Sequence, residues 1–229
     1  MSQLRHFEIE IAELKRSIVN MGNLVDRALT TAVEGILHPT ANVRDRVGAI
    51  EDQLDAMETM IEDRSHQILA LQSPMARDLR MLISSMRISS DLEQIGDLSQ
   101  SLAKRATYIA CHQSVSNPTQ LQPLARLVTS MVSRAMDLFV VGNLEVAKSL
   151  VADEILSDQL TKDCYGDIQA LMTSDGGKIR EYTHLLRAVS LLEHIGDIAI
   201  SITEEAVYVH TGKLFRHNHQ DMPEKPAEA

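Results

Sequence analysis

The sequence predicts an all-α protein of six long helices, arranged as two tandem three-helix bundles. Composition is the first reason, since 44% of the 229 residues are apolar, only 3% are aromatic and Trp is absent. A chain with few aromatics, few Gly and Pro, and many Leu, Ala, Met and Glu favours helix over sheet. An internal repeat is the second reason. Residues 92–97 read Leu-Glu-Gln-Ile-Gly-Asp and residues 192–197 read Leu-Glu-His-Ile-Gly-Asp, so each half should supply one bundle.

The first half divides into three helical segments. In residues 3–37 the apolar residues alternate in steps of 4 and 3, which is the core stripe of a long bundle helix. His38-Pro39 should end this helix, because proline lacks an amide donor. A second segment with similar spacing covers about residues 41–71. Ser73-Pro74 then resembles an N-cap followed by a first-turn proline, which predicts a third helix reaching about residue 112.

The second half repeats this pattern. A fourth segment should end near Val141, before a turn at Gly142-Asn143. The fifth segment should reach about Met172, and a loop follows it at residues 174–177. A sixth segment then runs to about Thr211.

Domain boundaries follow from the loops. The polar stretch at residues 112–120 is the credible boundary between halves. We therefore expect one bundle at residues 1–113 and a second at residues 114–213. Residues 214–229 are polar and contain Pro, and we expect them to form a disordered tail.

The repeat extends beyond the Gly-Asp motifs. At the same offset of 100, Arg80, Arg87 and Ser90 match Arg180, Arg187 and Ser190. In the preceding helices, Glu51-x-x-x-Asp55 matches Glu154-x-x-x-Asp158 at an offset of 103. The difference of three residues fits a shorter loop at residues 174–177.

Paired acids are the candidate functional residues. Residues four apart share one helix face, so each Glu-x-x-x-Asp projects two carboxylates in one direction. In the third segment Glu93 and Asp97 continue the stepwise series that begins at Leu79, and Glu193 and Asp197 continue an equivalent series in the sixth segment. We interpret these series as core stripes, where an acid is costly unless it is paired or bound to a metal.

Antiparallel packing of adjacent helices would bring the acids of each bundle together. Four carboxylates repel one another, and a multivalent cation with oxygen ligands removes the repulsion. Mg²⁺, Mn²⁺, Fe and Ca²⁺ suit such ligands, and Zn²⁺ is an alternative. For Glu51, Asp55, Glu154 and Asp158 a solvated acidic face stays open as the alternative, and for Glu58 and Glu62 we favour that interpretation. Gly96 and Gly196 are explained if a helix or a metal shell approaches the backbone there.

Other functions are disfavoured. The chain lacks a phosphate-cradling Gly-rich loop, a Gly-x-Ser-x-Gly and a His-Glu-x-x-His motif, so we expect no enzyme activity. Its net charge of −10 disfavours nucleic acid as a partner. Without a signal-peptide core or a run of about 20 apolar residues, we expect a cytoplasmic protein that meets a membrane only through partners.

Four stretches resemble the PhoU family of phosphate-signalling regulators. They are residues 4–22, 73–97, 191–197 and 208–217, and with the duplicated layout they extend the resemblance over about residues 4–217. The resemblance implies two tandem bundles, each able to hold divalent or trivalent metal ions such as Mg, Mn, Fe or Zn. One site would use Glu51, Asp55, Glu93 and Asp97, and the other would use Glu154, Asp158, Glu193 and Asp197. The family typically has Arg inside the Gly-Asp motif, where this chain has Gln94 and His194.

The resemblance also implies a function. PhoU-like proteins hold the phosphate-starvation response off, restrain phosphate uptake, and link the ATPase subunit of the phosphate ABC transporter to a sensor histidine kinase. Such proteins are often homodimers. The alternatives are a paralogue that serves another phosphate transporter and a metal-binding or metal-storage protein without a signalling role.

Overall fold

The computed structural model describes residues 2–112 and 115–214, and within them the regular elements are all helical. The elements are α1 (Ser2–Leu37), α2 (Val43–Gln72), α3 (Ala76–Cys111), α4 (Leu121–Val141), α5 (Leu144–Ser174), a 3₁₀ turn η1 (Gly176–Lys178) and α6 (Ile179–Thr211). The predicted all-α class with six helices is confirmed.

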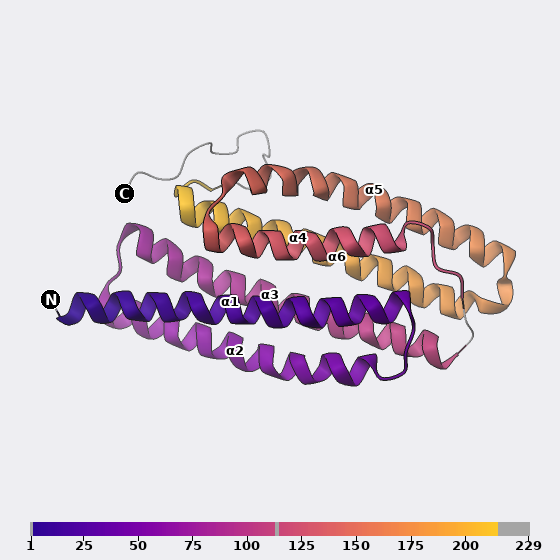
Figure 1. The fold of residues 1–229 in the computed structure, drawn as a ribbon, viewed down its shortest axis with the longest axis horizontal. Helices are drawn as coiled ribbons and strands as arrows, with labels where there is room; N and C mark the ends of the chain where they lie inside the picture. The colour runs from indigo at the N-terminus through magenta and orange to yellow at the C-terminus, as the bar shows by residue number, and fades with distance from the viewer. Residues whose placement is uncertain (1, 113–114, 215–229) are drawn as a thin grey trace.

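The six helices form two three-helix bundles that pack against each other (Figure 1). Helices α1, α2 and α3 pack against one another, and so do α4, α5 and α6. The bundles join where α1 lies against α4 and α3 lies against α6, while α2 and α5 lie at the outer edges. The connections between consecutive helices are short, so neighbours in each bundle run antiparallel.

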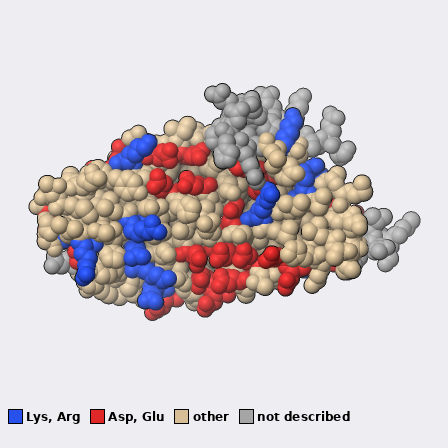
Figure 2. Space-filling view, turned by 180° about the vertical axis from the view of Figure 1, so that it is seen from behind, with Lys and Arg blue, Asp and Glu red and all other residues tan. Residues whose placement is uncertain are grey.

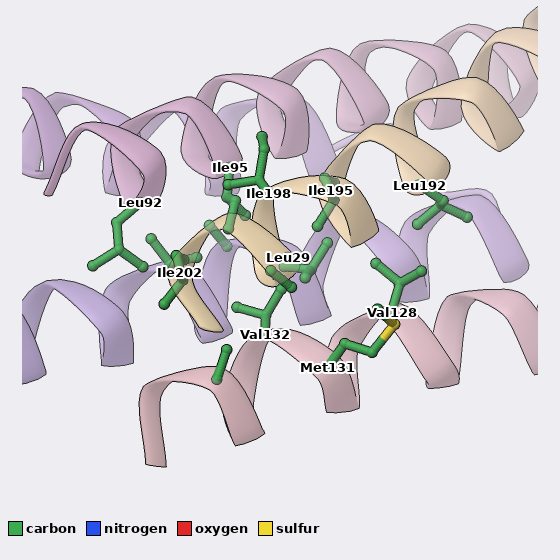
Figure 3. Close-up of a cluster of buried hydrophobic side chains, with 14 of the residues drawn as sticks. Leu29, Leu92, Ile95, Val128, Met131, Val132, Leu192, Ile195, Ile198 and Ile202 are labelled. Atoms are coloured by element: carbon green, nitrogen blue, oxygen red, sulfur yellow. The ribbon is translucent and has the colours of Figure 1, made fainter. Parts of the chain in front are cut away.

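The core is aliphatic and continues across the junction of the two bundles. Figure 3 shows Leu29 of α1, Ile95 of α3, Val132 of α4 and Ile198 of α6 in one cluster. Leu29, Ile95 and Val132 are at most 1% exposed. The two bundles therefore bury apolar surface against each other, which is the dominant favourable term in their association.

The helix ends follow local chemistry, with one correction. α1 ends at Leu37, directly before His38-Pro39, as predicted. Ser73, however, does not cap the start of α3. It adopts a left-handed conformation (φ 46°) as the C-cap of α2, and α3 begins only at Ala76. Pro74 ends α2 at this point, because its ring disfavours right-handed helical geometry in the residue before it.

Parts of the predicted domain division lie outside the described residues. These are residues 113–114 at the expected boundary and residues 215–229 of the expected tail. Within the described part of the chain, no helix is both long and apolar enough to span a bilayer.

Candidate metal centre

The first predicted set of acids lies where α2 packs beside α3. Glu51 and Glu93 are half-buried, whereas Asp55 and Asp97 are exposed. On the face of the molecule seen in Figure 2, acidic side chains gather over the α2 side and, in a smaller group, over the α5 side. The set is therefore a surface feature at the seam of two helices.

The predicted core stripe of α3 is wrong in its position. Leu79, which begins the series, is 37% exposed, whereas Leu92, Ile95 and Gly96 are buried. The buried stripe lies one residue beside the predicted one, and successive residues on a helix are about 100° apart around its axis. Because α3 contacts α1, α2 and α6, its buried face is wide, and Glu93 lies at the margin of that face. In α6 the corresponding acids have the same exposures, with Glu193 half-buried and Asp197 exposed.

The structure brings the four acids of the first set close enough to interact. Burial raises the pKa of Glu93, and the charges of Asp97, Glu58, Asp55 and Glu51 raise it further. Burial also raises the pKa of Glu51, with added contributions from Asp55, Asp97 and Asp52. The charges of Glu51, Asp55, Glu93 and Asp97 therefore influence one another across α2 and α3.

Three neighbours of this cluster were missed or misjudged from sequence. Glu58 contributes to the pKa of Glu93, so it belongs to the cluster and is half-buried. Gln100 donates a hydrogen bond from Nε2 to Glu51 Oε2 at 2.8 Å. Lys104 lowers the pKa of Glu51 and donates from Nζ to Gln100 Oε1. The signal was present in the spacing, since Gln100 and Lys104 follow Asp97 by three and seven residues.

The second set has a different environment. The Tyr165 hydroxyl donates to Glu193 Oε2 at 3.3 Å. Burial raises the pKa of Asp197, the neighbouring His194 lowers it, and Asp158 raises it. His194 Nδ1 lies 3.8 Å from Asp197 Oδ2. Glu154 is half-buried on α5, one turn before exposed Asp158. The structure therefore brings Asp158 and Asp197 together and gives Glu193 a tyrosine partner on α5.

The two motif glycines differ in their surroundings. A Cβ atom added to Gly96 would lie 2.5 Å from Leu54 Cδ1, so α2 approaches α3 closely there. At Gly196 the nearest atom is Ser157 Oγ at 3.5 Å, which is ordinary van der Waals contact. Close approach explains Gly96 but not Gly196.

The donor chemistry of the acidic sets fits a cation. Their ligands are carboxylate oxygens, which hard divalent and trivalent ions prefer. Burial is the main cause of the raised pKa of Glu51 and Glu93, and the mutual repulsion that raises it further is what a bound cation would relieve. With the side chains as placed, no group of three or more His, Cys, Asp or Glu among residues 2–112 and 115–214 converges to hold an ion.

A second polar cluster joins the two bundles. Glu205 of α6 is 4% exposed and accepts hydrogen bonds from Ser84 Oγ at 2.8 Å and Arg87 Nη1 at 2.7 Å. Ser201 Oγ donates to Asp91 Oδ2 at 2.9 Å. Burial raises the pKa of Asp91 to about 6. These contacts hold α3 against α6 and involve none of the predicted metal ligands.

This architecture defines a class: duplicated three-helix proteins with a carboxylate cluster at an α2–α3 seam and its counterpart at α5–α6. A model of the PhoU domain matches residues 18–106 and 121–206, one stretch in each bundle. The chain therefore belongs to the PhoU family.

Similarity to individual proteins extends over almost the whole chain. The chain is 28% identical, over 97% of its length and 91% of the relative's, to the phosphate-specific transport system accessory protein PhoU homolog of Zymomonas mobilis. It is 29% identical to the protein of that name in Pseudomonas aeruginosa, over 93% of the chain and 88% of the relative.

Two solved structures of the family have a similar fold. The crystal structure of PhoU from P. aeruginosa matches with a TM-score of 0.85 at 28% identity, covering 89% of this chain and 98% of that one. PhoU from Streptococcus pneumoniae, described as a phosphate transport system regulatory protein, matches with a TM-score of 0.83 at 26% identity, covering 91% of this chain and 99% of that one.

Proposed function

We propose that this chain is a negative regulator of the phosphate-starvation response and of phosphate uptake. The observation that supports it most strongly is the full-length similarity to accessory proteins of the phosphate-specific transport system, with the family domain matched in both bundles. Those relatives are named as accessory proteins, and the solved S. pneumoniae structure is described as a regulatory protein. We extend that role to this chain as a cytoplasmic, non-enzymatic adaptor.

The adaptor would contact two partners, the ATPase subunit of a phosphate ABC transporter and a sensor histidine kinase. Long helices offer extended surfaces for such contacts. Several large apolar side chains point outward, among them Leu71 at 76% exposed, Met75 at 80% and Val141 at 73%. Exposed apolar residues are typical of protein interaction sites when they gather into patches. A homodimer, which also needs an apolar contact, is part of this proposal.

The metal role is a further part of the proposal. Glu51, Asp55, Glu93 and Asp97 would hold one ion or cluster, and Glu154, Asp158, Glu193 and Asp197 the other. When bound, a divalent or trivalent ion such as Mg, Mn, Fe or Zn would supply positive charge that neutralises the carboxylates. The protein's own residues would fix the relative position of α2 with α3 and of α5 with α6. The support is the oxygen donor set and the raised pKa values at both seams.

Deletion of the gene tests the regulatory role directly. Alkaline phosphatase activity from a phosphate-regulated promoter should be high in the deletion strain in ample phosphate. Re-expression of this chain should return the activity to a low level. Activity that stays low in the deletion strain would contradict the proposal and favour a paralogue that serves another phosphate transporter.

A further inference from the structure

A groove of about 830 Å³ lies between the second half of α1, the start of α2, and α4. Helices α1 and α4 lie in front of α3 and α6 in Figure 1, so the groove is on the face opposite to that in Figure 2. Its volume is within the range of about 300–1,000 Å³ that small-molecule sites occupy. None of the eight predicted metal ligands lines it.

The groove concentrates arginine in an acidic protein. The chain has 22 Lys and Arg against 32 Asp and Glu, yet Arg46, Arg126 and Arg134 all line this one cavity. Arg134 donates hydrogen bonds to Asp153 Oδ2 and Ser149 Oγ of α5. For Arg46 and Arg126 the described residues provide no ion-pair or hydrogen-bond partner, and both side chains are exposed. Two unpaired guanidinium groups are suited to bind phosphate oxygens.

Two helix N-termini border the groove, and that of α2 adds to its positive potential. Thr40, Val43 and Arg46 bring the start of α2 to the groove, and Gln122 brings the start of α4. The N-cap residues Asn42 and Gln120 make no side-chain capping hydrogen bond. At α4 the Leu121 N–H donates to Pro118 O at 3.2 Å and Pro123 has no N–H. The first-turn N–H groups that would favour an anion are therefore those of α2.

The other residues that line the groove indicate which further chemical groups a ligand should have. Leu37 provides accessible apolar surface, whereas Val33 and Val43 are buried, at 7% and 1% exposed, and form part of the floor. The carboxylates of Asp26 and Glu34 also line the groove, and an ionised carboxylate only accepts hydrogen bonds. They would repel a bare phosphate but would accept bonds from ribose hydroxyls or an exocyclic amine. A matching ligand combines an anionic group, hydrogen-bond donors and an apolar planar body.

We propose that this groove binds a nucleotide, with its phosphates at Arg46 and Arg126 and its base against the apolar lining. The inference goes beyond the regulatory function and does not depend on it. Inorganic phosphate would fill a small fraction of the cavity and would use none of its apolar surface.

The absence of native Trp makes a direct test available. Gln122→Trp places one fluorophore at the exposed rim of the groove. The chain should be titrated with ATP without divalent cations, because Mg²⁺ would bridge ATP to the acidic face. We expect a saturable fluorescence change with a Kd below about 1 mM, and inorganic phosphate weaker by about tenfold or more. Isothermal titration calorimetry on the unsubstituted chain should give the same order of affinities, with ATP bound more tightly than inorganic phosphate. No binding in either measurement, or equal affinity for ATP and inorganic phosphate, would overturn the proposal.

Substitutions locate the site. Arg46→Ala and Arg126→Ala, introduced separately, should each weaken ATP binding by about tenfold, since each removes a charge-assisted contact. Arg44→Ala is the matched control, because Arg44 is exposed in the same turn of α2 but does not line the groove. Binding that is unchanged in both groove variants, or reduced equally in the control, would overturn this location. All three side chains are exposed, so the fold is expected to survive each change.

Discussion

Gln94 and His194 occupy equivalent positions in the two repeats, and their Nε2 atoms lie 3.4 Å apart. The internal twofold relation of the bundles therefore passes close to this contact between α3 and α6. Other contacts obey the same relation. Ser84 meets Glu205, and at the equivalent positions His184 Nδ1 lies 3.5 Å from Arg105 Nη1. At the junction of the two bundles, equivalent positions of the two repeats stay in contact, but the residue types at those positions differ.

The contact brings together the two positions at which this chain lacks Arg in the Gly-Asp motifs. Arg at both positions would place two guanidinium groups against each other, whereas Gln94 and His194 avoid that repulsion. We predict that Gln94→Arg and His194→Arg are each tolerated but that the double variant is less stable than the sum of the singles by about 0.5–1 kcal/mol. A double-mutant cycle in urea measures this coupling. The coupling should shrink at 1 M salt, because salt screens exposed charges, and a coupling of zero at low salt would contradict the explanation.

The raised pKa of Asp91 predicts a pH-dependent junction. Its pKa rises from 3.8 unfolded to about 6 folded, so the folded state binds this proton more tightly. The resulting stabilisation is complete below pH 3.8 and is lost as the pH rises through about 6. Ionised Asp91 should therefore cost about 2–3 kcal/mol at neutral pH, at about 1.4 kcal/mol per pKa unit. Glu205 and Glu204 add to this cost, and Arg87 and Ser201 oppose it.

Asp91→Asn tests this effect by removing the titration. The variant should have a higher free energy of unfolding than the wild type at pH 7.5, and this excess should be clearly smaller at pH 4.5. Urea denaturation at both pH values measures the difference. Asp63→Asn, at an exposed position of α2, is the control. A variant that is equally or less stable than the wild type at pH 7.5 would refute the assignment.

The two motif glycines provide a matched pair of substitutions. Gly196→Ala should stabilise the protein by up to about 1 kcal/mol, because Ala has the higher helix propensity and its Cβ meets only ordinary contact. Gly96→Ala places a Cβ 2.5 Å from a methyl of the fully buried Leu54. Overpacking of that kind costs about 1–3 kcal/mol. Thermal or urea unfolding should therefore show Gly96→Ala as the less stable variant, and the reverse order would disprove the close packing of α2 on α3.

The acidic clusters predict stabilisation by added metal. A cation at about 100 times its Kd stabilises the folded state by about 2.7 kcal/mol, which corresponds to a rise in Tm of about 5–10 °C for a chain of this size. Mn²⁺ should produce such a rise in the wild type at pH 7.5. The rise should be smaller at pH 5.5, because protons compete for carboxyl groups whose pKa is raised.

The rise should disappear when Glu93, Asp97, Glu193 and Asp197 are together replaced by their amides. Glu62→Gln with Asp63→Asn alters exposed acids on α2 and should leave the rise unchanged. An equal rise in the fourfold variant would show that Mn²⁺ binds elsewhere.

The sequence predicted most of the fold but only part of the site. Helix ends at Leu37, Val141 and Thr211 were readable because Pro or Gly follows each within two residues. The buried face of α3 was misplaced, because a helix that contacts three others buries more than the single stripe that a heptad pattern describes. The partners of Asp91 were not readable either, since Ser201 lies 110 residues away and meets it only through packing of α3 on α6. The same holds for the groove, which joins Arg46 and Arg126 from different bundles.

Phosphate uptake is the measurement that tests the central claim most directly. Initial rates of radiolabelled phosphate uptake should be compared, in ample phosphate, between the deletion strain and the same strain expressing this chain. The account predicts that the deletion strain takes up phosphate faster and that the chain restores the lower rate. Equal rates in both strains, with the chain shown to be expressed, would contradict it.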